Sequence, residues 1–251
     1  MRAQDRLLAA RKLVDEGRHE EALREYIWFH EHALKEDPAL SAVRRSYALR
    51  GWADLAKVYS PAGLALKAVR DRKTTALLSN EGDRGTFQDV AAINEYLDCL
   101  PQTHQLFKAL SQSWPEMAER CAHIALPAVL EAKDYELAER FIGDPLEKIA
   151  SWSEFLNNEI NRRRQRRFTH APRITAEISI YAADVEKLQT VLKGRGRLAE
   201  AREVGRLAVD SVKATTIRTA VAAALKMGTR RWFRIAARAH TRRLPRPKQR
   251  G

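Results

Sequence analysis

The apolar positions of this chain recur at intervals of three and four residues, the spacing that places them on one face of a helix. Leu7, Ala10 and Val14 show this spacing near the N-terminus. Between residues 174 and 192 the apolar positions alternate steps of four and three throughout. Alternation with a period of two, which is typical of strands, is confined to residues 178–180. The pattern therefore predicts an all-α protein.

A helical hairpin is predicted from about residue 4 to residue 35. Gly17 permits the left-handed turn that commonly ends a helix. A second apolar stripe then includes Ala22, Tyr26 and Phe29. The helix should end before Pro38, because the residue preceding a proline is disfavoured in the helical region.

The segment 9–38 resembles a tetratricopeptide repeat. In the first helix Ala10 occupies the family's small position and is followed by Leu13. The turn, packing, aromatic and terminal positions are occupied by Gly17, Ala22, Tyr26 and Pro38, in that order. The segment is one helical turn longer than the usual repeat and lacks the early tryptophan. The overall pattern is also similar to uncharacterised bacterial tetratricopeptide-like proteins, and the resemblance implies stacked helical hairpins but no particular activity.

Two weaker copies of the same pattern follow. Residues 133–141 repeat the turn, small-residue and aromatic order, and residues 196–201 repeat the turn and its packing alanine. Gly205 stands where the third copy should have an aromatic residue. The spacing of the copies is irregular, so the expected fold is an irregular right-handed α-solenoid of helical hairpins rather than a regular tandem array.

The remaining apolar stripes predict further helices, and the loop at residues 79–85 suggests a domain boundary. The other expected helices cover residues 40–55, 61–78, 87–100, 115–133 and 146–160. We expect N-terminal hairpins over residues 1–78, a bundle that continues the solenoid over 86–225, and a basic helix with a disordered tail over 226–251.

The formal net charge of +13 is spread unevenly along the chain. Residues 226–251 contain ten Lys and Arg and no Asp or Glu, which leaves +3 for the first 225 residues. Such an excess suggests an acidic partner, such as RNA, DNA or an anionic membrane surface. The alternative is a solvated tail that aids solubility.

Two segments contain the candidate binding residues for such a partner. The first contains Arg162, Arg163, Arg164, Arg166 and Arg167, and the second contains Arg230, Arg231, Trp232, Arg234, Arg238, Arg242 and Arg243.

Read as a helix, the second segment places its arginines on one face and Trp232, Ile235 and Ala236 on another. The arginines would bind phosphates, with Trp232 or Phe233 available for base stacking, or the helix would lie on an anionic membrane. Alternatively, its apolar face covers the last helix of the solenoid and the arginines face water.

No catalytic, cofactor or metal site is predicted. The chain has no phosphate-binding loop, nucleophile elbow or dinucleotide fingerprint. His30 and His32 are two positions apart and point in opposite directions on a helix, so we expect His30 to be hydrogen-bonded at the seam between helices. The spacings of His104 and His123 with Cys99 and Cys121 match no zinc pattern.

Two cysteines without a pattern suit a reducing compartment. No run approaches the roughly 18–20 apolar residues of a membrane span, and the N-terminus lacks the apolar core of a signal peptide. We therefore expect a cytoplasmic protein.

The preferred hypothesis for function is a non-enzymatic helical-repeat scaffold that binds another protein in a groove between helices. Trp28, Phe29, Trp52 and Tyr59 would either line such a groove or form core, and core is favoured. The alternative is nucleic-acid binding through the arginine-rich segments. A third hypothesis is an enzyme whose residues come together from distant helices.

Overall fold

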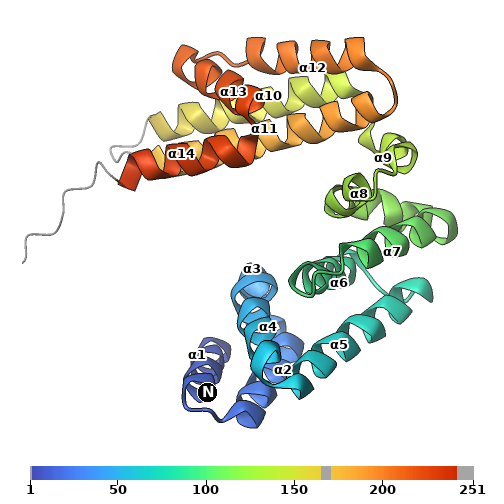
Figure 1. Cartoon of the computed structure of the whole chain (residues 1–251), viewed down its shortest axis with the longest axis vertical. Helices are drawn as coiled ribbons and strands as arrows, with labels where there is room; N and C mark the ends of the chain where they lie inside the picture. The colour runs from blue at the N-terminus through green and yellow to red at the C-terminus, as the bar shows by residue number, and fades with distance from the viewer. Residues whose placement is uncertain (1, 165–170, 242–251) are drawn as a thin grey trace, which may run out of the picture. The chain divides into compact units, whose positions relative to one another are not determined.

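The computed structural model describes residues 2–164 and 171–241, and every regular element within these two ranges is a helix (Figure 1). The predicted all-α class is confirmed. The chain divides into two compact units, residues 1–132 and residues 133–251. The loop near residue 80 joins two packed helices inside the first unit.

Consecutive helices of the first unit pack in pairs, as the hairpin pattern predicted; α1 lies on α2, α4 on α5 and α7 on α8. Contacts also join α4 to α6, α6 to α8 and α5 to α7. The elements are α1 (Ala3–Asp15), α2 (His19–Glu36), η1 (Pro38–Leu40), α3 (Ser41–Val43), η2 (Arg44–Ala48), α4 (Leu49–Val58), α5 (Ser60–Leu78), α6 (Arg84–Tyr96), α7 (Leu100–Ser113) and α8 (Pro115–Glu131).

The second unit is arranged around one long helix, α11, which contacts each of the other helices of the unit. Its elements are α9 (Tyr135–Ile142), α10 (Pro145–Arg164), α11 (Ala171–Gly194), α12 (Leu198–Asp210), α13 (Thr215–Met227) and α14 (Thr229–Thr241). Polar side chains join the helices to one another. The Tyr181 hydroxyl donates to the Ala208 carbonyl at 2.8 Å, and Asn157 Nδ2 donates to the Ser211 carbonyl at 2.9 Å.

The glycine turns predicted from the sequence have the expected geometry. Gly17 has a φ of 75°, and its N–H donates to the Val14 carbonyl at 3.0 Å. Gly196 has a φ of 76°, and its N–H donates to the Lys193 carbonyl, also at 3.0 Å. Both turns therefore satisfy the last carbonyls of the preceding helix in the same way.

One predicted helix is wrong in its extent. The stripe over residues 87–100 suggested a single helix, but α6 ends at Tyr96 and α7 begins at Leu100. Asp98 occupies the left-handed region, with a φ of 56°. Leu97 and Leu100 kept the helical spacing across this turn, so the apolar pattern did not reveal the break.

The first hairpin is held by large buried side chains. Phe29 and Trp52 are buried, which confirms that they belong to the core, and Trp52 Nε1 donates to the Ala62 carbonyl at 2.9 Å. Trp28 and Tyr59 are partly buried against the same core. Tyr26 is packed so tightly on Gly51 of α4 that a Cβ there would overlap its ring and hydroxyl.

Candidate functional site

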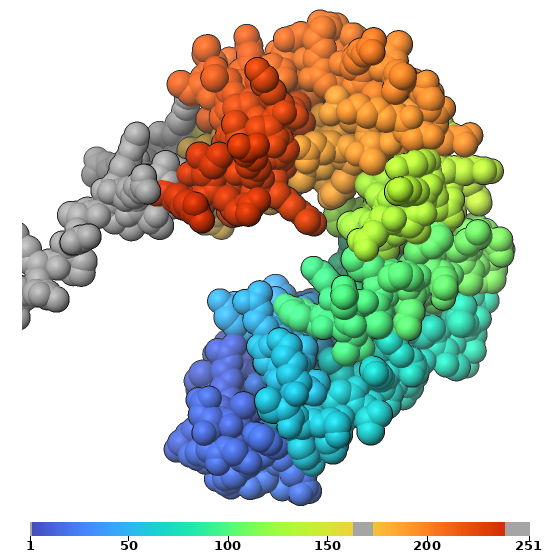
Figure 2. Space-filling model, viewed as in Figure 1, coloured from blue at the N-terminus to red at the C-terminus, as the bar shows by residue number. Residues whose placement is uncertain are grey.

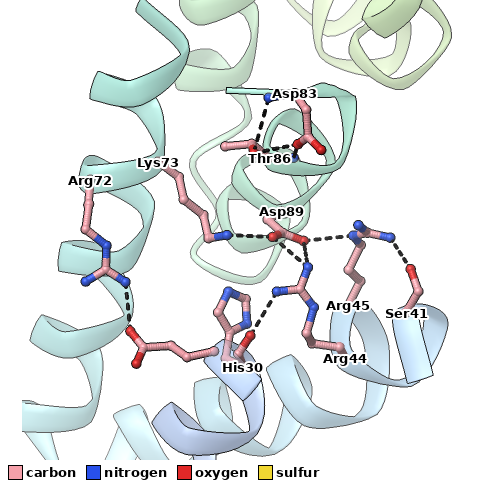
Figure 3. A network of polar contacts seen from close by, with 10 residues as sticks. His30, Ser41, Arg44, Arg45, Arg72, Lys73, Asp83, Thr86 and Asp89 are labelled. Atoms are coloured by element: carbon pink, nitrogen blue, oxygen red, sulfur yellow. Dashed lines mark hydrogen bonds and ion pairs between the residues drawn. The ribbon is translucent and has the colours of Figure 1, made fainter. Parts of the chain in front are cut away.

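A buried carboxylate in the first unit binds three cationic side chains (Figure 3). Asp89 on α6 is only 2 % exposed. Nη2 of Arg44 donates to both of its oxygens, at 2.6 and 2.7 Å, and Nε of Arg45 donates at 2.8 Å. Lys73 on α5 completes the set through Nζ at 2.7 Å. We call Asp89, Arg44, Arg45 and Lys73 the Asp89 cluster.

The local backbone brings two adjacent arginines to one carboxylate. Arg44 and Arg45 begin η2, a π-helical turn between α3 and α4, and both approach Asp89 from the same side in Figure 3. Nη1 of Arg44 also donates to the His30 carbonyl at 2.9 Å, and Nη1 of Arg45 to the Ser41 hydroxyl at 2.6 Å. The cluster therefore ties α2, α3, η2, α5 and α6 together.

The charge of Asp89 is stabilised by its partners. Burial alone would raise the pKa of its carboxyl, but the positive charges of Arg44 and Lys73 outweigh that effect and lower the pKa. An ionised carboxylate whose oxygens are held by three cations is poorly suited to accept a proton from a substrate. The geometry of the Asp89 cluster is that of an ion-pair network that stabilises the packing of helices, and not that of a general base.

The histidine next to the cluster departs from expectation. His30 is 3 % exposed, and neither ring nitrogen has a hydrogen-bond partner among the residues that the structure describes, which differs from the predicted hydrogen bond. The ring instead packs at an edge-on angle against Trp52, with 6.0 Å between centroids. Burial, followed by the charge of Arg44, lowers the pKa of His30 to about 3. The imidazole is therefore neutral at physiological pH.

No metal-ligating group forms in the parts of the chain that the structure describes. There, no three His, Cys, Asp or Glu side chains gather closely enough to hold an ion. His32 stacks on Trp28, and its Nδ1 lies 3.0 Å from the Trp28 carbonyl oxygen. Cys121 is buried, and this burial raises the pKa of its thiol to about 11.

The predicted arginine-rich helix exists and presents its arginines to solvent. Figure 2 shows α14, in red, at the surface of the second unit. Trp232 and Ala236 are half-buried. The exposed arginines are Arg230, Arg231, Arg234 and Arg238. At 100° per residue these four cover one side of the helix, opposite the side of Thr229, Trp232 and Ala236. We call them the arginine stripe.

The apolar face of α14 is narrower than the sequence suggested. Ile235, expected beside Trp232, is 54 % exposed, and Phe233 is 39 % exposed. These two side chains lie on opposite borders of the arginine stripe. The helix is held at its start by Glu186 of α11, which accepts a hydrogen bond from the Thr229 N–H at 2.8 Å.

The end of α10 and the last turns of α14 lie at the same end of the second unit (Figure 1). α10 and α11 contact each other and run in opposite directions, so the end of α10 and the start of α11 lie at the same end of the second unit (Figure 1). Since α14 begins beside Glu186 and runs back along α11, its last turns lie at that same end (Figure 1). Arg162, which pairs with Glu159 at 3.1 Å, and Arg238 therefore belong to one region of the unit.

Several predicted site residues fall outside the described part of the chain. Arg166, Arg167, Arg242 and Arg243 are not described, nor are the side chains of Arg163 and Arg164 at the end of α10.

The net positive charge of the chain is concentrated in the second unit. Residues 133–251 contain 27 Lys and Arg against 13 Asp and Glu, a net charge of +14. Residues 1–132 contain 18 against 19, a net charge of −1. The last acidic residue of the chain is Asp210, so α13 and α14 contain none. The second unit is thus the part of the protein that attracts anions.

Comparisons with known proteins add no family to these observations. A scan against protein-family models finds no match, and searches of curated proteins and of solved structures find none either. None of the helices in the described ranges has the length and hydropathy needed to cross a membrane.

Proposed function

We propose that this protein is a non-enzymatic binding protein whose second unit holds the phosphate backbone of a nucleic acid. One observation carries the proposal. The arginine stripe is exposed on the side of α14 that faces away from the rest of the unit, in a helix without acidic residues. A cytoplasmic location, where RNA and DNA would both be encountered, is part of the proposal.

The chemistry and length of the stripe fit a phosphate backbone. Guanidinium groups present several donors in a planar fork that matches phosphate oxygens. From Arg230 to Arg238 the helix rises about 12 Å, the length of about three to four stacked nucleotides at roughly 3.4 Å each. Arg162, at the end of α10, would extend this contact along the strand.

The packing of α14 favours nucleic acid over a membrane surface. An interfacial helix buries its apolar face at the boundary of the lipid headgroups. In α14 the side of Trp232 and Ala236 already packs against the rest of the unit, because both residues are half-buried and Glu186 accepts a hydrogen bond from the first turn. The side left to a partner is the arginine stripe, bordered by Phe233 and Ile235, and its four cations suit contact with phosphates.

Fluorescence anisotropy with a labelled RNA or DNA tests this proposal. A variant with all four arginines of the stripe changed to Gln should bind at least tenfold more weakly than the natural chain. The matched control changes Lys12, Arg24, Lys57 and Lys67, four exposed cations of the first unit, to Gln. Equal affinities of the two variants would contradict the proposal, because both lose four exposed positive charges and only one loses them from the arginine stripe.

A protein partner is the second candidate, and exposed apolar side chains on the first unit favour it. Leu8 is 63 % exposed and Tyr47 is 60 % exposed, and the Arg11 guanidinium lies 5.3 Å from the centroid of the Tyr47 ring. A right-handed solenoid of tetratricopeptide-like hairpins would offer such residues to a peptide, and the sequential helix pairs support that arrangement. Crosslinking in native cells tests this candidate, since a stoichiometric protein partner should disappear with Leu8→Asp and Tyr47→Asp.

A further inference from the structure

We infer that the nucleic acid bound by the second unit is single-stranded and that one of its bases stacks on Phe233. This inference rests on the proposed function and adds the class of strand to it. It depends on the exposed ring of Phe233 at the border of the arginine stripe and on the paired, stacked state of bases in a duplex, which leaves no base free to stack on that ring.

Of the two aromatic residues of α14, Phe233 has the exposure that base stacking requires and Trp232 does not. Trp232 is half-buried on the packing side of the helix, so its ring is not presented to a partner. Phe233 is 39 % exposed and lies between that side and the arginine stripe. A nucleotide whose phosphate is bound by Arg230 or Arg234 would place its base on the Phe233 ring.

Small side chains leave room for a base beside the Phe233 ring. On a helix, the neighbours of a residue along the same face are the residues three and four positions away. For Phe233 these neighbours are Thr229, Arg230, Ala236 and Ala237. Three of the four side chains are too small to cover the aromatic ring, and the fourth, Arg230, belongs to the arginine stripe. Stacking on such a ring tolerates any base, because every base has an aromatic face.

Double-stranded nucleic acid fits this surface less well. A helix that reads a duplex enters the major groove, which in B-DNA is about 12 Å wide and 8.5 Å deep. The bases of a duplex are paired and stacked on one another, so they present no free aromatic face to a ring on the surface of α14. A duplex would therefore touch only the arginine stripe, and its stacked bases would not reach Phe233.

Three fluorescein-labelled probes distinguish these cases by anisotropy. They are single-stranded oligothymidylate of about 12 nucleotides, several times the reach of the stripe, its duplex with oligoadenylate, and an abasic strand of equal length and charge. The natural chain should bind the single strand more tightly than the other two probes.

Changing Phe233 to Ala should weaken single-strand binding by roughly 5- to 100-fold, the range found for the loss of one base–aromatic stack. Binding of the duplex and of the abasic strand should stay unchanged. Phe233→Trp should preserve the preference for the single strand, whereas Phe233→Leu should lose it. Circular dichroism of each variant shows whether α14 remains folded.

The outcomes separate this inference from the proposed function. Equal binding of all three probes, with no effect of Phe233→Ala, would overturn the inference and leave a phosphate-binding stripe. Failure of every probe to bind would contradict both. Tight binding to phosphatidylserine vesicles that is lost in Phe233→Ala, without binding to the oligonucleotides, would also overturn both and would identify an anionic membrane as the partner.

Discussion

Arg44 and Asp89 are 45 positions apart in the chain, yet Nη2 of the arginine donates to both carboxylate oxygens at 2.6 and 2.7 Å in the interior of the first unit. Both side chains are less than a tenth exposed. A buried pair of this kind is costly to assemble but much more costly to break, because removing one partner leaves the other charged and unpaired. It therefore makes the packing of η2 against α6 specific.

Replacing Asp89 with Asn should destabilise the first unit by about 3–5 kcal/mol, since Arg44 would stay buried without an opposite charge. Urea denaturation, with hydrogen exchange to identify the unit affected, measures the loss. Asp54→Asn is the matched control, because Asp54 pairs with Lys57 on the surface, with 57 % of its side chain exposed. That change should cost less than about 0.5 kcal/mol. A similar loss in both variants would show that the Asp89 cluster has no special role.

His30 should make the first unit sensitive to acid. Its pKa is lowered to about 3 in the folded chain, whereas an unfolded histidine has a pKa near 6.5. Between these two values the unfolded state binds the additional proton, so stability is complete above pH 6.5 and is lost as the pH falls. The slope should approach about 1.4 kcal/mol per pH unit.

Urea denaturation of the natural chain and of His30→Leu, measured from pH 7 to pH 4.5, checks this expectation. The leucine variant has no titrating group at this position and no hydrogen bond to lose, since neither ring nitrogen of His30 has a partner. Its stability should fall less over this range. Identical pH profiles for the two proteins would contradict a buried neutral histidine.

Two glycines should respond in opposite directions to an added methyl group. A Cβ at Gly194 would overlap the ring of Tyr135, which packs α9 against the end of α11, so Gly194→Ala should cost about 1–3 kcal/mol. A Cβ at Gly63 would meet only the Ala56 side chain, at 3.5 Å. Gly63→Ala should therefore stabilise α5 by about 0.5–1 kcal/mol.

Hydrogen exchange of α5, α9 and α11 measures both changes locally. A second substitution, Tyr135→Ala, should remove most of the additional cost of Gly194→Ala, because the clash requires the ring. If the penalty of Gly194→Ala were the same with and without the ring, the close packing of α9 would be incorrect.

The two thiols should differ in reactivity. Burial raises the pKa of Cys121 to about 11, so almost none of it is thiolate at pH 8, while Cys99 is only partly buried. A chromogenic disulfide reagent at pH 8 should react rapidly with one thiol per chain. Cys99→Ser should abolish that rapid reaction and Cys121→Ser should leave it intact; rapid reaction of two thiols would contradict the burial of Cys121.

The spacing of apolar residues predicted most of the helices, but it did not reveal every turn between them or the polar contacts that hold them together. The turns at Gly17 and Gly196 could be predicted because the need for a left-handed residue is local. The break at Asp98 was missed because the apolar spacing continues through it. The Asp89 cluster was missed for a different reason. Its carboxylate and its nearest arginine are 45 positions apart, and pairing over such a distance leaves no pattern in one sequence.

The arginine-rich helix could be predicted from the sequence, but its arrangement could not. The helical spacing placed the arginines of α14 on one face, whereas Ile235 was assigned to the packing side and is 54 % exposed. Only the fold shows that α14 runs back along α11, toward the end of the unit where α10 also ends (Figure 1). The sequence alone left the two segments as separate candidates.

The salt dependence of nucleic-acid binding tests the central claim most directly. For a single strand, the logarithm of the affinity falls with the logarithm of the salt concentration by about 0.7 for each phosphate that is neutralised. Changing Arg230, Arg231, Arg234 and Arg238 to Gln should make this slope shallower by about 0.7 for each arginine in contact with a phosphate, so by about 2–3 in total. An unchanged slope would show that the arginine stripe does not hold the phosphate backbone.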